Sequence, residues 1–93
     1  MKNYEGLFIL KPDQENEEVA NSYKKIQDNI SKHQGQVQDA QEWGKKKLAY
    51  KIKKHGDGIF YLLRFTMDPA QLKPLTQDYK LDESILRVAI TAA

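Results

Sequence analysis

The chain has 93 residues, no cysteine, and a formal net charge of +2 from 15 Lys and Arg against 13 Asp and Glu. This length suits one small domain with a single modest core, spanning residues 1–93. The absence of cysteine excludes disulfides and Cys-ligated zinc. No apolar run approaches the roughly 20 residues that span a bilayer, and the first residues lack the apolar core of a signal peptide. We therefore expect a soluble cytoplasmic domain without membrane contact.

The first third of the chain predicts a strand followed by a helix. Asn3–Leu10 is the strand, and Lys11-Pro12-Asp13 ends it because proline lacks a ladder donor. Gln14–His33 is the helix, and Gly35 is expected to stop it. Its apolar side chains fall on one helical stripe: Val19, Tyr23, Ile26 and Ile30. The acidic residues at its start complement the helix dipole, so we interpret them as a solvated helix start and not as a metal site.

The middle of the chain predicts two strands. Gln36–Ile52 is extended, and Gly44 within it is expected to form a bulge or bend. The composition of Lys54–Gly58 predicts a turn. Ile59–Thr66 is nearly all apolar, which predicts a central strand of the sheet.

The last third predicts a helix and a final strand. Asp68 and Pro69 suit the N-cap and the first helical position. A helical stripe follows at Leu72, Leu75 and Tyr79. Pro74 within this stripe means that the helix is distorted there or begins later. The final strand is Ile85–Thr91, with one side made of Leu86, Val88 and Ile90.

The order strand, helix, strand, strand, helix, strand is the ferredoxin-like arrangement of the α+β class. We expect an antiparallel sheet with the strands in the order four, one, three, two and both helices on one face. An unpaired buried charge is costly, so the helices should cover the uncharged side of the strands. That side carries Tyr4, Phe8 and Leu10 on the first strand and Ile59, Tyr61, Leu63 and Phe65 on the third.

The opposite, open face predicts a surface for a partner. It is apolar on the central strands and edged by charged residues, and single exposed apolar residues would not form such a patch. An ion pair across the strands is the expected role of Glu5 with Arg64 or Arg87. The predicted interface residues are Glu5, Leu7, Ile9, Phe60, Leu62 and Arg64.

A basic segment predicts contact with phosphates. Six of the 15 Lys and Arg residues lie between Lys45 and Lys54, interleaved with apolar and aromatic side chains. Crowded ammonium groups repel one another unless a polyanion meets them, and phosphates would release counterions on binding. Lysines that merely protect an edge strand would account for two or three of these residues and not for six.

Sequence features of an enzyme are absent. His33 and His55 lack metal-ligand spacing, and both are predicted to be solvated. No serine lies in a nucleophile elbow, and no Walker-type loop is present. We expect no cofactor, no metal and no small-molecule substrate.

The segment Gly44-Lys-Lys-Lys-Leu-Ala-Tyr50-x-Ile52, together with Tyr4-Glu5, Gly58-x-Phe60 and Ile85-Leu86-Arg87, resembles the bacterial small-subunit ribosomal protein six family. The resemblance covers nearly the whole chain and implies the same six-element fold. It also implies binding to the central domain of small-subunit ribosomal RNA beside small-subunit ribosomal protein eighteen. In one departure, Lys51 stands where the family commonly has Pro.

The resemblance implies that the open face docks the second ribosomal protein. It adds three positions that tend to be basic or aromatic in the family to the lysine segment. The resulting candidate RNA contacts are Lys2, Tyr4, Lys45, Lys46, Lys47, Lys51, Lys53, Lys54 and Arg87.

Two other functions share this topology. A generic RNA-recognition domain would stack bases on aromatic rings of the open face, where Phe60 alone is expected on the first and third strands. An acylphosphatase-like enzyme would need an anion-binding loop with an Arg after the first strand, and Lys11-Pro12-Asp13-Gln14 has none.

Overall fold

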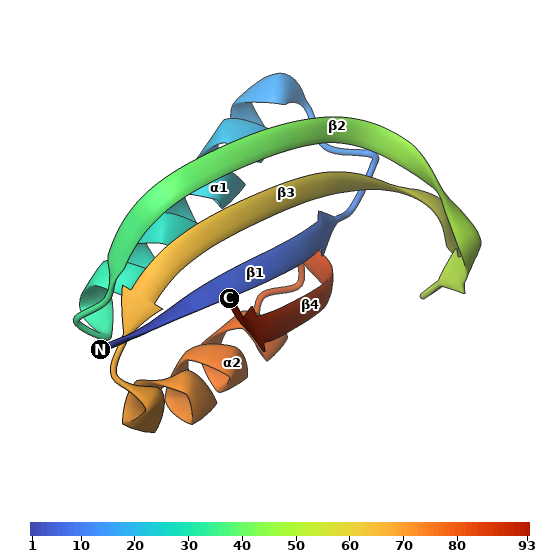
Figure 1. The fold of residues 1–93 in the computed structure, drawn as a ribbon. Helices are drawn as coiled ribbons and strands as arrows, with labels where there is room; N and C mark the ends of the chain where they lie inside the picture. The colour runs from blue at the N-terminus through green and yellow to red at the C-terminus, as the bar shows by residue number, and fades with distance from the viewer.

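A four-stranded antiparallel sheet carries two helices in the computed structural model, which describes residues 1–93 (Figure 1). The strand order β2-β3-β1-β4 confirms the predicted ferredoxin-like topology. β2 and β3 are long and curve beyond the end of β1 (Figure 1). In chain order the elements are β1 Lys2–Leu10, α1 Asn16–Lys32, β2 Gln36–Ile52, β3 His55–Met67, a 3₁₀ turn Pro69–Gln71, α2 Leu72–Lys80 and β4 Ile85–Ala92.

The core lies between the helices and the uncharged side of the sheet, as predicted. Phe8 packs edge-on against Tyr79 of α2, with ring centroids 4.9 Å apart. Tyr61 stacks on Tyr23 of α1 at 4.1 Å. The Tyr79 hydroxyl donates a hydrogen bond to the Ile26 carbonyl at 2.6 Å, so the one polar atom of this ring is paired. Burial raises the pKa of Tyr79 far above its ordinary value, which keeps this donor protonated.

The end of α1 differs from the prediction by one residue. The left-handed conformation falls on Gln34, at φ 64°, and not on Gly35. The Gly35 amide donates to Ile30 at 2.8 Å and the Gln34 amide to Ser31 at 2.9 Å, the bonding pattern of a Schellman motif. Gly35 is required for space instead, because a Cβ there would lie within 3 Å of Ile30 and Met67.

The turn between β2 and β3 also corrects the prediction. It lies at Lys53 and Lys54, both with positive φ, and β3 already begins at His55. A two-residue hairpin turn of this kind requires positive φ at both central positions, whatever residues occupy them. Gly58 lies within β3, where a Cβ would collide with Ile9. Gly44 does form the predicted bulge, with φ 79° at a shift in the β2–β3 register.

The start of the second helix resolves the position of Pro74. Asp68 accepts a hydrogen bond from the Ala70 amide at 3.0 Å and caps the 3₁₀ turn. α2 then begins at Leu72, which places Pro74 in its first turn. Amides of the first turn have no acceptor within the helix, so the missing N–H of proline costs nothing there. The later start predicted as one option is therefore confirmed.

β4 joins the core through a different residue from the one predicted. Leu10 pairs with Ile85 and Ile9 pairs with Arg87, so a register shift leaves Leu86 without a partner position on β1. Ile85 therefore belongs to the core cluster, and Leu86 is buried outside it. Val88 and Ile90 pack against the core as predicted, and only Leu86 departs from the predicted alternation, because it is the extra residue of the bulge between Ile85 and Arg87.

His33 is not solvated, which corrects the prediction for this histidine. Its side chain is 13% exposed, and its Nε2 lies 2.7 Å from the Asp78 carboxylate. Its Nδ1 lies 3.1 Å from the Gln71 side-chain oxygen. The hydrogen bond with His33 holds the pKa of Asp78 below its ordinary value. His33 thus joins the end of α1 to α2.

Candidate nucleic-acid and protein interface

The basic segment forms the part of the sheet that extends beyond the core. The pairing of β1 with β3 ends at Leu10 and Ile59, so β2 and β3 beyond that point pair only with each other. We call residues 45–58 the basic hairpin. All six of its lysines are exposed. None of them forms an ion pair, because every ion pair in the structure involves Asp78 or Glu5.

The lysines at the base of the hairpin project to both sides of the sheet. Lys45 lies opposite Ile59, a core residue, and therefore faces the helix side. Lys46 lies opposite Gly58 and faces the open side, where its ammonium sits 5.3 Å above the ring of Trp43. Such a cation–π contact orients the ammonium without neutralising its charge.

The hairpin is tied back to the open face of the sheet. The Arg87 guanidinium of β4 donates a hydrogen bond to the hydroxyl of Tyr50 at 3.1 Å. Leu48 lies beside Gly58, and Gly58 in turn lies against Ile9. Because a two-stranded ribbon alone is only marginally stable in water, these contacts are what hold the curved hairpin in place.

The open face has an apolar centre with a shallow hollow. Leu7 lies between Leu62 on β3 and Ala89 on β4. The hollow has a volume of 330 Å³ and is lined by Glu5, Leu7, Trp43, Leu62, Ala89 and Thr91. At its edge, Glu5 forms an ion pair with Arg64 across the strands, with 3.3 Å between the Glu5 carboxylate and the Arg64 Nε, as predicted. An apolar hollow with a charged rim is the usual anatomy of a protein interface.

The model of the family described as "Ribosomal protein S6" matches residues 3–92, nearly the whole chain. The chain belongs to this family.

Individual relatives agree with this assignment. The small ribosomal subunit protein bS6 of Moorella thermoacetica is 34% identical over 91 residues, which are 98% of this chain and 93% of the relative. That of Helicobacter acinonychis is 34% identical over 90 residues, and the chain spans only 63% of its length. The crystal structure of 30S ribosomal protein S6 from Thermotoga maritima superposes with a TM-score of 0.94 at 27% identity, covering 99% of this chain and 87% of that one. The relatives are named as ribosomal proteins and not as enzymes.

The structure divides the predicted RNA contacts of this S6-family chain into three groups. Six lysines lie in the basic hairpin, and Arg87 contacts the hairpin through its hydrogen bond to Tyr50. Lys2 is exposed at the other end of β1, opposite Met67. Tyr4 is only 7% exposed, and its ring packs against Phe65 in the core. We therefore leave Tyr4 out of the RNA surface proposed below.

The predicted partner surface comes together with one addition. Leu7, Phe60 and Leu62 are half-buried on the open face. Ile9 is 7% exposed, because the hairpin covers it. The added residue is Trp43, which the sequence analysis did not assign to this surface; the structure places it in the wall of the hollow, 44% exposed. The signal that could have found it is a large aromatic residue directly before the bulge at Gly44.

No group of His, Asp and Glu side chains is arranged to hold a metal ion. No helix is long and apolar enough to cross a bilayer.

Proposed function

We propose that this chain is a structural component of the bacterial ribosomal small subunit, where it binds the central domain of small-subunit ribosomal RNA and pairs with small-subunit ribosomal protein eighteen. The observation that carries the proposal is the presence of two distinct exposed surfaces, a basic hairpin and an apolar open face, on one sheet. Family membership supports the same role, since the named relatives are small ribosomal subunit proteins.

The basic hairpin supports the RNA half of the proposal. Its lysines carry unneutralised charge on an extension that protrudes beyond the core (Figure 1). Phosphate contacts from such side chains position the protein and supply sequence-independent affinity through counterion release. The extension can lie along an RNA groove without moving the core, because its base continues directly into the sheet.

The open face supports the protein half. Its hollow is walled by Leu7, Leu62 and Trp43, a combination that can enclose one apolar side chain of a partner. The Glu5–Arg64 pair at the rim can exchange hydrogen bonds with polar groups around that side chain. The two surfaces adjoin at Lys46 and Trp43, so a partner on the open face would reach the RNA beside the hairpin.

A generic RNA-recognition domain is less well supported. It would stack bases on open-face rings of the two central strands, but Phe8 and Tyr61 are buried beneath the helices. Phe60 is the only aromatic residue on the open side of β1 and β3, where it lies opposite the buried Ile9.

Reconstitution tests the proposal. The full chain, protein eighteen and a transcript of the central domain are mixed singly, in pairs and together, and complexes are measured by sedimentation. We expect a protein pair without RNA and a ternary complex with the transcript. The chain alone should bind more weakly than the pair. Absence of both the pair and the ternary complex, with a folded chain confirmed by circular dichroism, would rule the proposal out.

A further inference from the structure

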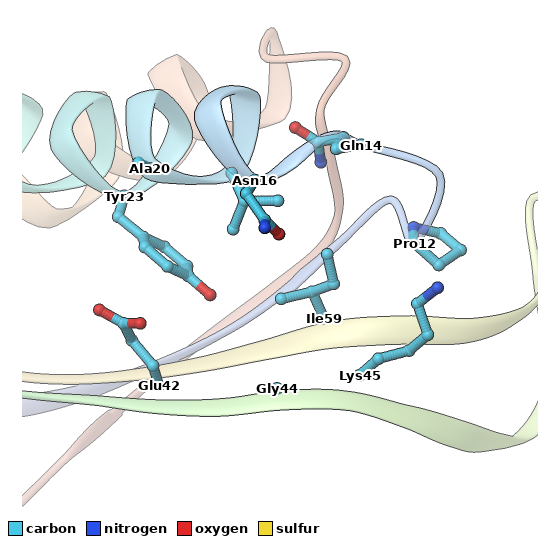
Figure 2. Close-up of a pocket in the computed structure, with 10 residues that line it drawn as sticks. Pro12, Gln14, Asn16, Ala20, Tyr23, Glu42, Gly44, Lys45 and Ile59 are labelled. Carbon is cyan, nitrogen blue, oxygen red and sulfur yellow. The ribbon is translucent and has the colours of Figure 1, made fainter.

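A second hollow lies on the helix side of β2, facing the beginning of α1 (Figure 2). Its volume is 490 Å³, within the range of about 300–1,000 Å³ of small-ligand pockets. One wall is apolar and consists of Val19, Ala20, Tyr23 and Ile59. Glu42 and Lys45 of β2 supply charged groups, and Figure 2 shows the Lys45 side chain extending toward the loop that precedes α1.

The carboxylate of Glu42 has no protein partner. It is absent from the ion pairs of the structure, including any with Lys45, and no side chain donates a hydrogen bond to it. Glu42 lies opposite Tyr61 in the β2–β3 register and so faces the helix side. Figure 2 shows its carboxylate near the ring of Tyr23, whose hydroxyl points into the hollow. Burial and this carboxylate raise the pKa of Tyr23, so the hydroxyl remains a donor.

This acid is unfavourable for RNA binding unless RNA donates to it. A carboxylate three residues before Lys45–Lys47 repels the phosphates that those lysines attract. A base edge with N–H donors would turn the repulsion into a hydrogen bond. A carboxylate offers two adjacent acceptors, and the Watson–Crick edge of guanine is the base edge with two adjacent donors, N1–H and the N2 amino group.

We infer, on the basis of the RNA binding proposed above, that this hollow takes one unpaired guanine base of the ribosomal RNA. The Glu42 carboxylate accepts from the two donors of the base, and the apolar wall covers the base plane. Lys45 meets the phosphate of the same nucleotide or its neighbour. The base must be unpaired because a double helix occupies this edge with its partner base.

Uridine heptamers with a single central nucleotide test the inference on the full chain. The central nucleotide is guanosine, inosine, which lacks the N2 amino group, or adenosine. Fluorescence anisotropy should show the guanosine heptamer binding about tenfold more tightly than the other two. Glu42→Gln should abolish this preference, because an amide has a single acceptor oxygen.

Asp39→Asn is the matched control. It removes the same charge from the same strand but lies opposite Arg64, on the open side. Removing an acid should strengthen phosphate attraction, so Asp39→Asn should bind the central-domain transcript as tightly as the parent or more tightly. Glu42→Gln should bind the transcript more weakly. Loss of a negative charge by itself would strengthen binding, so general electrostatics cannot produce this change.

Equal affinity of the parent chain for the three heptamers would overturn the inference. So would a Glu42→Gln variant that keeps the guanosine preference, or one that loses protein eighteen while its RNA affinity is unchanged. If the transcript is bound with protein eighteen but no guanosine preference exists, the pocket assignment alone fails. If neither transcript nor heptamers are bound, the proposed function fails with it.

Discussion

The helix-covered part of the sheet and the basic hairpin are made from the same two strands, yet they are stabilised in different ways. In the covered part, β3 carries Leu63 and Phe65, which are buried in one cluster with residues of both helices. In the hairpin, the same strand pairs only with β2 and is held by Leu48, Tyr50 and their contacts. The comparison teaches that the core determines the fold, while the extension is free to carry charge because little packing depends on it.

The sharpest test of this difference compares neighbours on β3. Leu63 is 0% exposed and Leu62 is half-buried on the open face. Leu63→Ala should lower the free energy of unfolding by about 3 kcal/mol, because it leaves a cavity in the core. Leu62→Ala should lower it by about 1 kcal/mol or less. Urea denaturation followed by circular dichroism measures both, and equal losses would contradict the assignment of faces.

A charge on the open face should separate folding from pairing. Leu62→Asp should leave the fold intact and weaken the pair with protein eighteen at least about thirtyfold, since an unpaired carboxylate would be buried in the interface. Pull-down and calorimetry measure the pairing. Leu81→Asp is the control, because Leu81 is an exposed leucine directly after α2. Normal pairing of the Leu62→Asp variant would mean that the partner binds elsewhere.

Removing charge from the hairpin should weaken RNA binding without affecting stability. Replacing Lys45, Lys46 and Lys47 with Ala should lower affinity for the central-domain transcript about tenfold and reduce the slope of log K against log salt by about two. Replacing Lys24, Lys25 and Lys80 removes the same charge from the helices and should change the slope little. A filter-binding titration at several salt concentrations compares the two triple variants, and identical slopes would argue against the hairpin as the RNA surface.

The smallest effect should appear only in acid. The folded-state pKa of Asp78 is lowered, chiefly by its hydrogen bond with His33. At Asp78, the unfolded chain therefore binds protons more readily than the folded chain does. The contribution of Asp78 to stability is complete above pH 3.8, the ordinary pKa of this side chain, and it is lost as the pH falls through the lower folded-state pKa. Asp78→Asn should flatten the decline of the urea midpoint below pH 3.8, whereas Asp28→Asn, on the exposed side of α1, should not.

Much of the fold could be predicted from local patterns, and the failures share one cause. The strands, the helical stripes and the choice of buried face follow from periodicity and from the cost of burying charge. The positions of Gln34, Lys53 and Leu86 could not be predicted in this way. Each of these positions depends on the residue at which strand pairing or a helix cap begins. A shift of one residue there changes the backbone conformation of the segment although its amino-acid composition is the same.

For the candidate site too, features formed by residues close in the sequence could be predicted, and features formed by distant residues could not. The basic segment is visible in the sequence as a run of lysines, and the open face is visible as apolar residues at alternate positions of the central strands. Both surfaces could be predicted because each strand contributes residues that lie close together in the sequence. The burial of Tyr4 and Ile9, and the place of Trp43 in the open-face hollow, depend on neighbours distant in sequence.

By itself, then, the sequence determined which side of each strand avoids water and where positive charge accumulates, since both are properties of side chains and their local spacing. Only the tertiary structure decided that the hairpin curls onto β4 through Tyr50 and Arg87, and that Glu42 faces Tyr23 across a hollow. Those arrangements come from the register and curvature of paired strands, which many residues determine together and no short segment specifies.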